Sequence, residues 1–148
     1  MQIGERTVIV KAPAQAAWDK LVDWSSMHEW DVFMEWIRFD GPLRNGSKGR
    51  LKMRGGAEVD IVVTAFEAQK RYTDEFRLLG SRFVFHHEIT GRPDGDTAVR
   101  IAVEAHGAFA GLIGPTMRAQ MKEKMPVLMA KFKRQLEEGT KYGAPDGR

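Results

Sequence analysis

The feature that most constrains this chain is a series of short, alternating segments that fills residues 32–107. In the last of them, Thr97–Gly107, apolar and polar side chains alternate, and a period of two is typical of a strand with one buried face. Turn-forming residues separate the segments, and Asn45-Gly46 is the strongest hairpin signal among them. We therefore predict six antiparallel strands: Val32–Asp40, Lys48–Arg54, Glu58–Phe66, Arg71–Leu79, Arg82–Thr90 and Thr97–Gly107.

One more strand and two short helices are expected before this series. The β-branched run within Arg6–Lys11 predicts a strand. Pro13 suits the first turn of a helix, and apolar residues at helical spacing continue that helix to Val22. The segment Trp24–Trp30 is expected to form a second short helix or a turn.

A long helix is predicted at the C-terminal end. Its apolar stripe recurs at steps of three and four residues: Met117, Met121, Met125, Leu128, Phe132 and Leu136. Gly139 is the expected stop, so we predict one domain over residues 1–139 and a flexible tail over residues 140–148. Pro126 lies inside the helix and predicts a kink, which either follows the sheet or widens the mouth of a cavity.

Strands that are segregated from helices indicate an α+β fold. A curved antiparallel sheet with one apolar face needs a cover, and only the long helix is large enough to provide it. A chain of 148 residues is long enough for one domain with a sizeable core.

Composition excludes several classes of function. The net charge of +3, from 23 basic and 20 acidic residues, is too small to indicate a nucleic-acid-binding protein. The absence of cysteine excludes disulfides and cysteine-based metal sites. We see neither a signal peptide nor an apolar run that could span a bilayer, so we expect a cytoplasmic protein without an integral membrane segment.

Metal and cofactor sites are not expected either. His86 and His87 are adjacent in one predicted strand, so they point to opposite faces and cannot bind the same ion. No glycine-rich loop lies between a strand and a helix in the arrangement that binds phosphates.

Two inward-facing polar residues are candidates for acid–base chemistry. His87 shares the apolar face of its strand with Phe83 and Phe85, where it either binds a ligand and transfers protons or is bonded to a neighbour in the core. Asp74 shares a row with Phe76, and His87 or Arg82 on the next strand could pair with it.

The register of that strand leaves the direction of Asp74 open, because a slip of one residue would turn the carboxyl toward solvent. Glu35 has the same ambiguity, since it shares a row with Phe33, Ile37 and Phe39.

The sequence resembles a known superfamily in three places. The opening TVIVKAPAQAAWDKLVDWSSMHEW resembles the start of the SRPBCC superfamily, which is also called the START or helix-grip superfamily. The segments FDGPLRNGSKGRLKM and HHEITGRPDGDTAVRIAVEAHG resemble its second and last hairpins. The closest branch is the polyketide cyclase/dehydrase-like proteins. The resemblance covers about residues 3–138 and rests on these positions: Ala12-Pro13-Ala14, Trp18, Asp23-Trp24, Trp30, Gly41, Gly46, Gly49 and Asp94–Thr97.

The resemblance implies a helix-grip fold, in which a curved sheet of about seven strands wraps the C-terminal helix around a cavity. The helix methionines, which include Met129, are then either core residues or part of the cavity wall. We expect the following residues to line the cavity: Trp30, Leu51, Met53, Phe76, Phe85, His87, Ile101, Val103, Met117 and Met121.

Three functions are compatible with this expectation. The first is binding of a small hydrophobic, lipid-like or polyketide-like molecule. The second is a cyclase or dehydratase that uses His87 and Asp74 as acid and base. The third is a protein-binding module similar to the co-chaperone branch of the superfamily, which would expose an apolar patch. The ligand and the oligomeric state are left open.

Overall fold

A computed structural model describes residues 1–142 and contains one seven-stranded antiparallel sheet, which confirms the predicted α+β class. The elements follow the predicted order: β1 (Gln2–Val10), α1 (Ala14–Val22), the 3-10 helix η1 (Trp24–Glu29), β2 (Met34–Phe39), β3 (Lys48–Met53), β4 (Glu58–Glu67), β5 (Arg71–Leu78), β6 (Ser81–Gly91), β7 (Thr97–Gly107) and α2 (Ala110–Tyr142).

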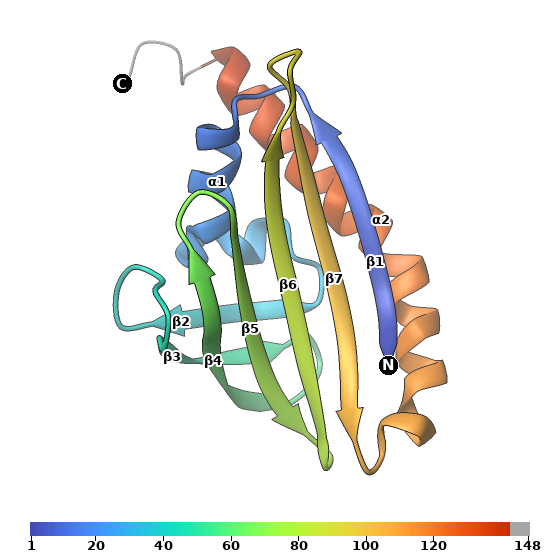
Figure 1. The fold of residues 1–148 in the computed structure, drawn as a ribbon. Coiled ribbons are helices and arrows are strands. Elements are labelled where there is room, and N and C mark those ends of the chain that lie inside the picture. Colours follow the sequence, from blue (N-terminus) through green and yellow to red (C-terminus); the bar gives the residue numbers. More distant parts are fainter. Residues whose placement is uncertain (143–148) are drawn as a thin grey trace.

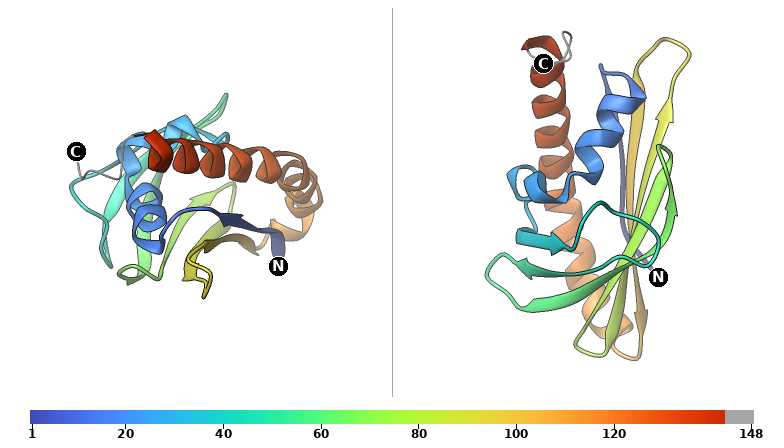
Figure 2. Two further views of the ribbon diagram at one scale, coloured as in Figure 1. Left: turned by 90° about the horizontal axis from the view of Figure 1, so that it is seen from above. Right: turned by 90° about the vertical axis from the view of Figure 1, so that its left-hand side faces the viewer.

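The sheet has the order β1-β7-β6-β5-β4-β3-β2. Hairpins join each neighbouring pair from β2 to β7, and β1 crosses over to pair with β7. Figure 1 shows the sheet curling, so that β2 and β3 run across the direction of β5–β7. The helix α2 lies along the concave side, and the two views in Figure 2 show it bending along its length. This is the predicted helix-grip arrangement.

A β-bulge decides the direction of Glu35. The pairing of β2 with β3 shifts between Met34 and Trp36, so the strict alternation fails at this point. Met34 and Ile37 are buried, whereas Glu35 is exposed and forms an ion pair with Lys52 at 2.8 Å. The inward alternative for Glu35 is therefore wrong.

The helix α2 continues beyond its predicted stop. It passes through Gly139 to Tyr142, and residues 143–148 of the predicted tail lie outside the described residues. Contacts of the last turns explain the difference. Leu136 is buried, and the Glu137 carboxylate accepts hydrogen bonds from the Lys133 ammonium and from the Lys11 backbone N–H, both at 2.7 Å. These contacts anchor the turn before Gly139, and one glycine, which costs a helix about 1 kcal/mol relative to alanine, does not end a helix anchored in this way.

Aromatic residues close the upper end of the space between sheet and helix. Trp18 of α1 contacts Tyr72 edge to face, with ring centroids 6.3 Å apart. Trp30, which follows η1, contacts Phe132 of α2 in the same way at 4.9 Å. These contacts fix the two short helices against the sheet and α2, and they leave the space below them between the concave face and α2.

Candidate functional site

A partly enclosed cavity of about 280 Å³ lies between the concave face of the sheet and α2. This volume is close to the lower end of the range of small-molecule sites, which begins at roughly 300 Å³. All ten residues expected from the sequence line it: Trp30, Leu51, Met53, Phe76, Phe85, His87, Ile101, Val103, Met117 and Met121. That they bind a ligand stays a prediction.

The helix contributes one face to the cavity. Met117, Met121, Met125 and Leu128 line it at steps of four, four and three residues, as the periodicity of an α-helix requires. Methionine side chains are flexible and polarizable, so this wall can adapt to ligands of different shape. Met129, the fourth methionine of the predicted set, is buried but does not line the cavity.

Asp74 points into the cavity. Its strand pairs with β6 in an unbroken register in which Asp74 lies opposite Phe85, and the side chain is 7% exposed. Burial raises the pKa of the Asp74 carboxyl to about 8, and the nearby Asp31 carboxylate adds to this shift. The outward alternative for Asp74 is therefore wrong, and at neutral pH the carboxyl is mostly protonated.

The expected partners of Asp74 do not bind it. Arg82 faces the outer side of the sheet and forms an ion pair with Glu75 at 3.0 Å. His87 lies opposite Tyr72, one diagonal step from Asp74. Neither a hydrogen bond nor a cation among the described residues lowers the pKa of Asp74. The carboxyl is thus buried without a partner.

His87 stacks on a neighbouring ring. It lies parallel to Tyr72, with centroids 4.2 Å apart, and no described group meets its Nδ1 in hydrogen-bonding geometry. Burial lowers the pKa of His87 to about 4, so the ring is neutral at physiological pH. A neutral imidazole of such low basicity is a poor general base, which weakens one of the two predicted catalytic roles.

Asp31, a second carboxyl in the cavity, was not predicted from the sequence. This residue lies between η1 and β2, and its Oδ1 accepts a hydrogen bond from the Phe33 backbone N–H at 2.9 Å. An aspartate that bonds to the backbone two residues on is usually an ordinary turn residue, so its sequence position carries no signal of function. Burial raises the pKa of Asp31 to about 6, although the charge of Arg54 opposes the shift.

The cavity therefore combines an apolar wall with unsatisfied polar groups. Besides Asp74, three side-chain polar atoms among the described residues have almost no accessible surface and no hydrogen-bond partner: Trp30 Nε1, Ser81 Oγ and His87 Nδ1. Two of the three belong to cavity-lining residues. Such an atom costs about 1–3 kcal/mol unless a water, an ion or a ligand meets it.

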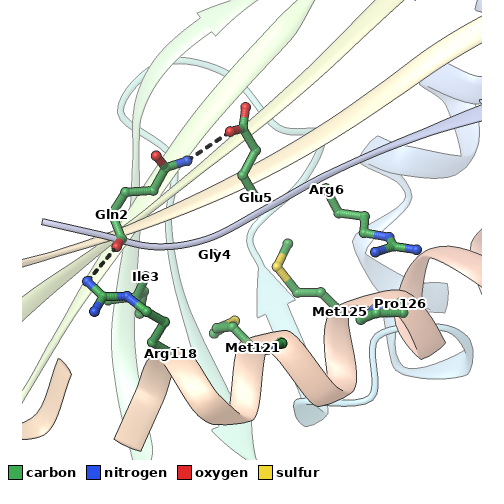
Figure 3. A pocket seen from close by; sticks show the side chains of 10 residues that line it. Gln2, Ile3, Gly4, Glu5, Arg6, Arg118, Met121, Met125 and Pro126 are labelled. Atoms are coloured by element: carbon green, nitrogen blue, oxygen red, sulfur yellow. Dashed lines mark hydrogen bonds between the residues drawn. The ribbon is translucent and has the colours of Figure 1, made fainter. Parts of the chain in front are cut away.

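A second depression lies on the outside, between β1 and α2. It is an open groove of about 410 Å³, shown in Figure 3, where the Arg118 guanidinium donates to the Gln2 carbonyl at 3.2 Å. Met121 and Met125 line both the groove and the cavity, so they form part of the wall between them. Because the groove is more open than the cavity and fewer apolar side chains line it, the cavity is the better candidate for an apolar ligand.

The third predicted function, a protein-binding module, would need an exposed apolar patch. Leu79, Phe109 and Leu112 are 70%, 51% and 76% exposed, and Phe109 lies against Gly80. Leu79 lies in the β5–β6 turn, Phe109 in the β7–α2 connection and Leu112 in the first turn of α2. These segments lie at the same end of the molecule (Figure 1). Binding of another protein at this end stays a prediction.

Other expectations concern absences. No helix within residues 1–142 is long and apolar enough to cross a membrane. The part of the chain that the structure describes holds no cluster of three histidine, aspartate or glutamate side chains with metal-binding geometry. The predicted cytoplasmic location and the absence of a nucleic-acid partner stay predictions.

Comparisons with known proteins agree with this architecture. The family model described as "Polyketide cyclase / dehydrase and lipid transport" matches residues 1–137. No curated protein matches the chain with significance.

Three solved structures illustrate the likeness of fold. DynU16, from the dynemicin biosynthetic locus, has a TM-score of 0.70 at 22% identity; the match covers 92% of this chain but only 47% of DynU16, so the chain spans about half its length. A START superfamily protein from Mycobacterium smegmatis has a TM-score of 0.70 at 13% identity, with 90% and 96% covered. Norcoclaurine synthase from Thalictrum, in complex with a transition-state analogue, has a TM-score of 0.70 at 10% identity, with 92% and 94% covered. These identities support a common fold only.

Proposed function

Because the chain belongs to the polyketide cyclase/dehydrase and lipid transport family, we propose that it binds one small, largely apolar molecule in the partly enclosed cavity. The observation that carries this proposal is the cavity itself, which aromatic and aliphatic side chains line on the sheet and methionines line on α2. Burial of apolar surface supplies the affinity, and the few polar groups orient one end of the molecule.

Binding of a neutral apolar fluorophore tests the proposal. N-phenyl-1-naphthylamine should bind saturably, with one site per chain. Met117→Trp adds a ring that fills the cavity, so it should weaken binding about tenfold or more. Val127→Trp adds the same ring to the same helix at an exposed position outside the cavity, so it should leave binding unchanged.

The two variants also define the contradicting result. If the folded Met117→Trp protein binds the fluorophore as tightly as Val127→Trp does, the probe does not occupy this cavity. Native mass spectrometry of the purified protein provides a second readout, because a bound cellular ligand would add a discrete mass.

A cyclase or dehydratase is the second candidate, and the two carboxyls favour it. Asp31 has a pKa of about 6 and is largely ionised at neutral pH, whereas Asp74, with a pKa of about 8, keeps its proton. Two carboxyls whose environments separate their pKa values are suited to be base and acid. In the dehydration of a β-hydroxy ketone, Asp31 would take the α-proton and Asp74 would protonate the leaving hydroxyl, so that one water is released.

The assay for this candidate is loss of one water from a β-hydroxy ketone substrate, followed by mass spectrometry. Asp74→Asn should abolish turnover because the amide has no proton of suitable acidity. Turnover that persists in Asp74→Asn would exclude this mechanism. Glu75→Gln is the matched control, because Glu75 lies next to Asp74 on β5 but faces the other side of the sheet.

A further inference from the structure

The charged and polar groups of the cavity are distributed unevenly. The cations on its lining, Arg54 and Lys124, are exposed to solvent. Asp74 is buried, and the carboxyl of Asp31 is desolvated enough to raise its pKa. Water and salt screen exposed charges strongly and buried charges much less. The interior of the cavity is therefore acidic, and its rim is basic.

We propose that Asp74 and Asp31 form a subsite for a basic nitrogen, so that the cavity selects an apolar amine over the alcohol and the carboxylic acid of the same shape. This inference rests on the proposed function, since it concerns the polar end of a molecule bound in the same cavity.

Geometry is the first support. Asp74 lines the cavity, is more than nine-tenths buried, and accepts no hydrogen bond from any described residue that stabilises its charge. A ligand ammonium offers three donors and a full positive charge to this carboxylate. A ligand hydroxyl offers one donor and no charge. A ligand carboxylate would meet the like charge of the Asp31 carboxylate, and its own charge would oppose ionisation of Asp74.

The protonation states agree with this assignment. The titratable groups that line the cavity together with Asp74 are Asp31 from the η1–β2 connection, Tyr72 on β5 and His87 on β6. Its cations are Arg54 from the β3–β4 turn and Lys124 on α2. Burial raises the pKa of Tyr72 and lowers that of His87, so both rings are neutral near pH 7. Neither of them can supply the positive charge that an ionised Asp74 lacks.

The proton balance gives the proposal a specific signature. The free amine carries a proton as the ammonium, and the free protein carries a proton on Asp74. In the complex, the ammonium pairs with the Asp74 carboxylate, and one proton leaves for the buffer. Amine binding near pH 7 should therefore release close to one proton. The affinity for the amine should rise with pH, by up to about tenfold per pH unit, until the pH reaches the pKa of Asp74, which is about 8.

Three probes that share the adamantyl cage test the selectivity: 1-adamantylamine, 1-adamantanol and 1-adamantanecarboxylate. Isothermal titration at pH 7 in two buffers of different ionisation enthalpy measures affinity and proton release together. We expect the amine to bind at least about tenfold more tightly than the alcohol, and the carboxylate to bind most weakly. The affinity of the alcohol should not change between pH 6 and pH 8.

Variants assign the effect to the carboxyls. Asp74→Asn should bring the amine-to-alcohol affinity ratio close to one and abolish proton release, and Asp31→Asn should lower the ratio partially. Glu75→Gln, on the outer face of the same strand, should preserve the parent ratio. If Asp74→Asn does not fold, proton release and pH dependence in the parent protein still decide the question.

The possible failures are distinguishable. If Met117→Trp blocks the alcohol but the amine has no advantage, the cavity site stands and the amine subsite is wrong. The amine subsite is also wrong if the advantage of the amine survives in Asp74→Asn. If Met117→Trp blocks none of the probes, the proposed function and this inference are both wrong.

Discussion

The buried Asp74 carboxyl should make the folded protein less stable as the pH rises above neutrality. In the unfolded chain this carboxyl has its ordinary pKa of 3.8 and is ionised throughout this range, whereas in the folded chain its pKa is about 8. The folded state therefore binds more protons, and linkage requires stability to fall with rising pH until the folded carboxyl has ionised. Between pH 6.5 and pH 9 the loss from this one group is about 2 kcal/mol.

This pH window separates Asp74 from its neighbours. Asp31, with a pKa of about 6, is mostly ionised at the start of this window. His87 has a pKa of about 4 when folded and 6.5 when free, so the unfolded chain loses the rest of this proton early in the window. That loss raises stability with pH and cannot produce the expected fall. Urea denaturation at half-unit pH steps gives the free energy of unfolding for the parent protein and for Asp74→Asn. The variant should lose the downward slope that the parent shows. A parent curve that is flat or rising across the window, or an equal slope in Asp74→Asn, would refute the reasoning.

Three further predictions concern packing and protonation. Gly4→Ala should lower the free energy of unfolding by about 1–3 kcal/mol in thermal denaturation, because a Cβ at Gly4 would lie 2.9 Å from Met121 Cβ and from Met125 Sδ. Gly139→Ala is the control and should cause no loss, because nothing lies within 4 Å of a Cβ there. Equal effects of the two variants would contradict the packing argument. As the pH falls from 7 to 5, the parent should lose about 2 kcal/mol of stability relative to His87→Phe in urea denaturation, because the folded His87 ring resists protonation and the unfolded one does not. If the difference in unfolding free energy between the two proteins is the same at both pH values, the ring is hydrated. Pro126→Ala should raise stability by up to about 3 kcal/mol and leave stopped-flow association of N-phenyl-1-naphthylamine unchanged, whereas slower association would give Pro126 a gating role.

The order of the elements and the inner face of the sheet could be predicted because they depend on local patterns. Alternation along β5–β7 identified the buried rows, and glycine-rich turns marked their ends. The cavity wall followed from these rows once α2 was recognised as the cover. For this reason the residues expected around Phe85, Ile101 and Met121 all lie on one cavity.

The rest depends on tertiary contacts that local patterns do not encode. The bulge at Met34 and Trp36 turned Glu35 outward, and only the pairing with β6 fixed the direction of Asp74. The first half of β1, from Gln2 to Glu5, has no strand pattern and is extended because it pairs with β7. Asp31 joins the site only because η1 folds over the sheet.

The crossover of β1 has a consequence for how the protein is made. Gln2 pairs with Glu104, so β1 leaves the ribosome before its partner strand and meets it only after about a hundred further residues have been synthesised. At roughly 5–20 residues per second, β1 waits on the order of ten seconds with its backbone donors and acceptors unpaired. During this interval it is open to pairing with neighbouring nascent chains, a hazard that charged side chains such as Glu5 and Arg6 reduce. The nascent chain can therefore complete its sheet only after β7 has been made.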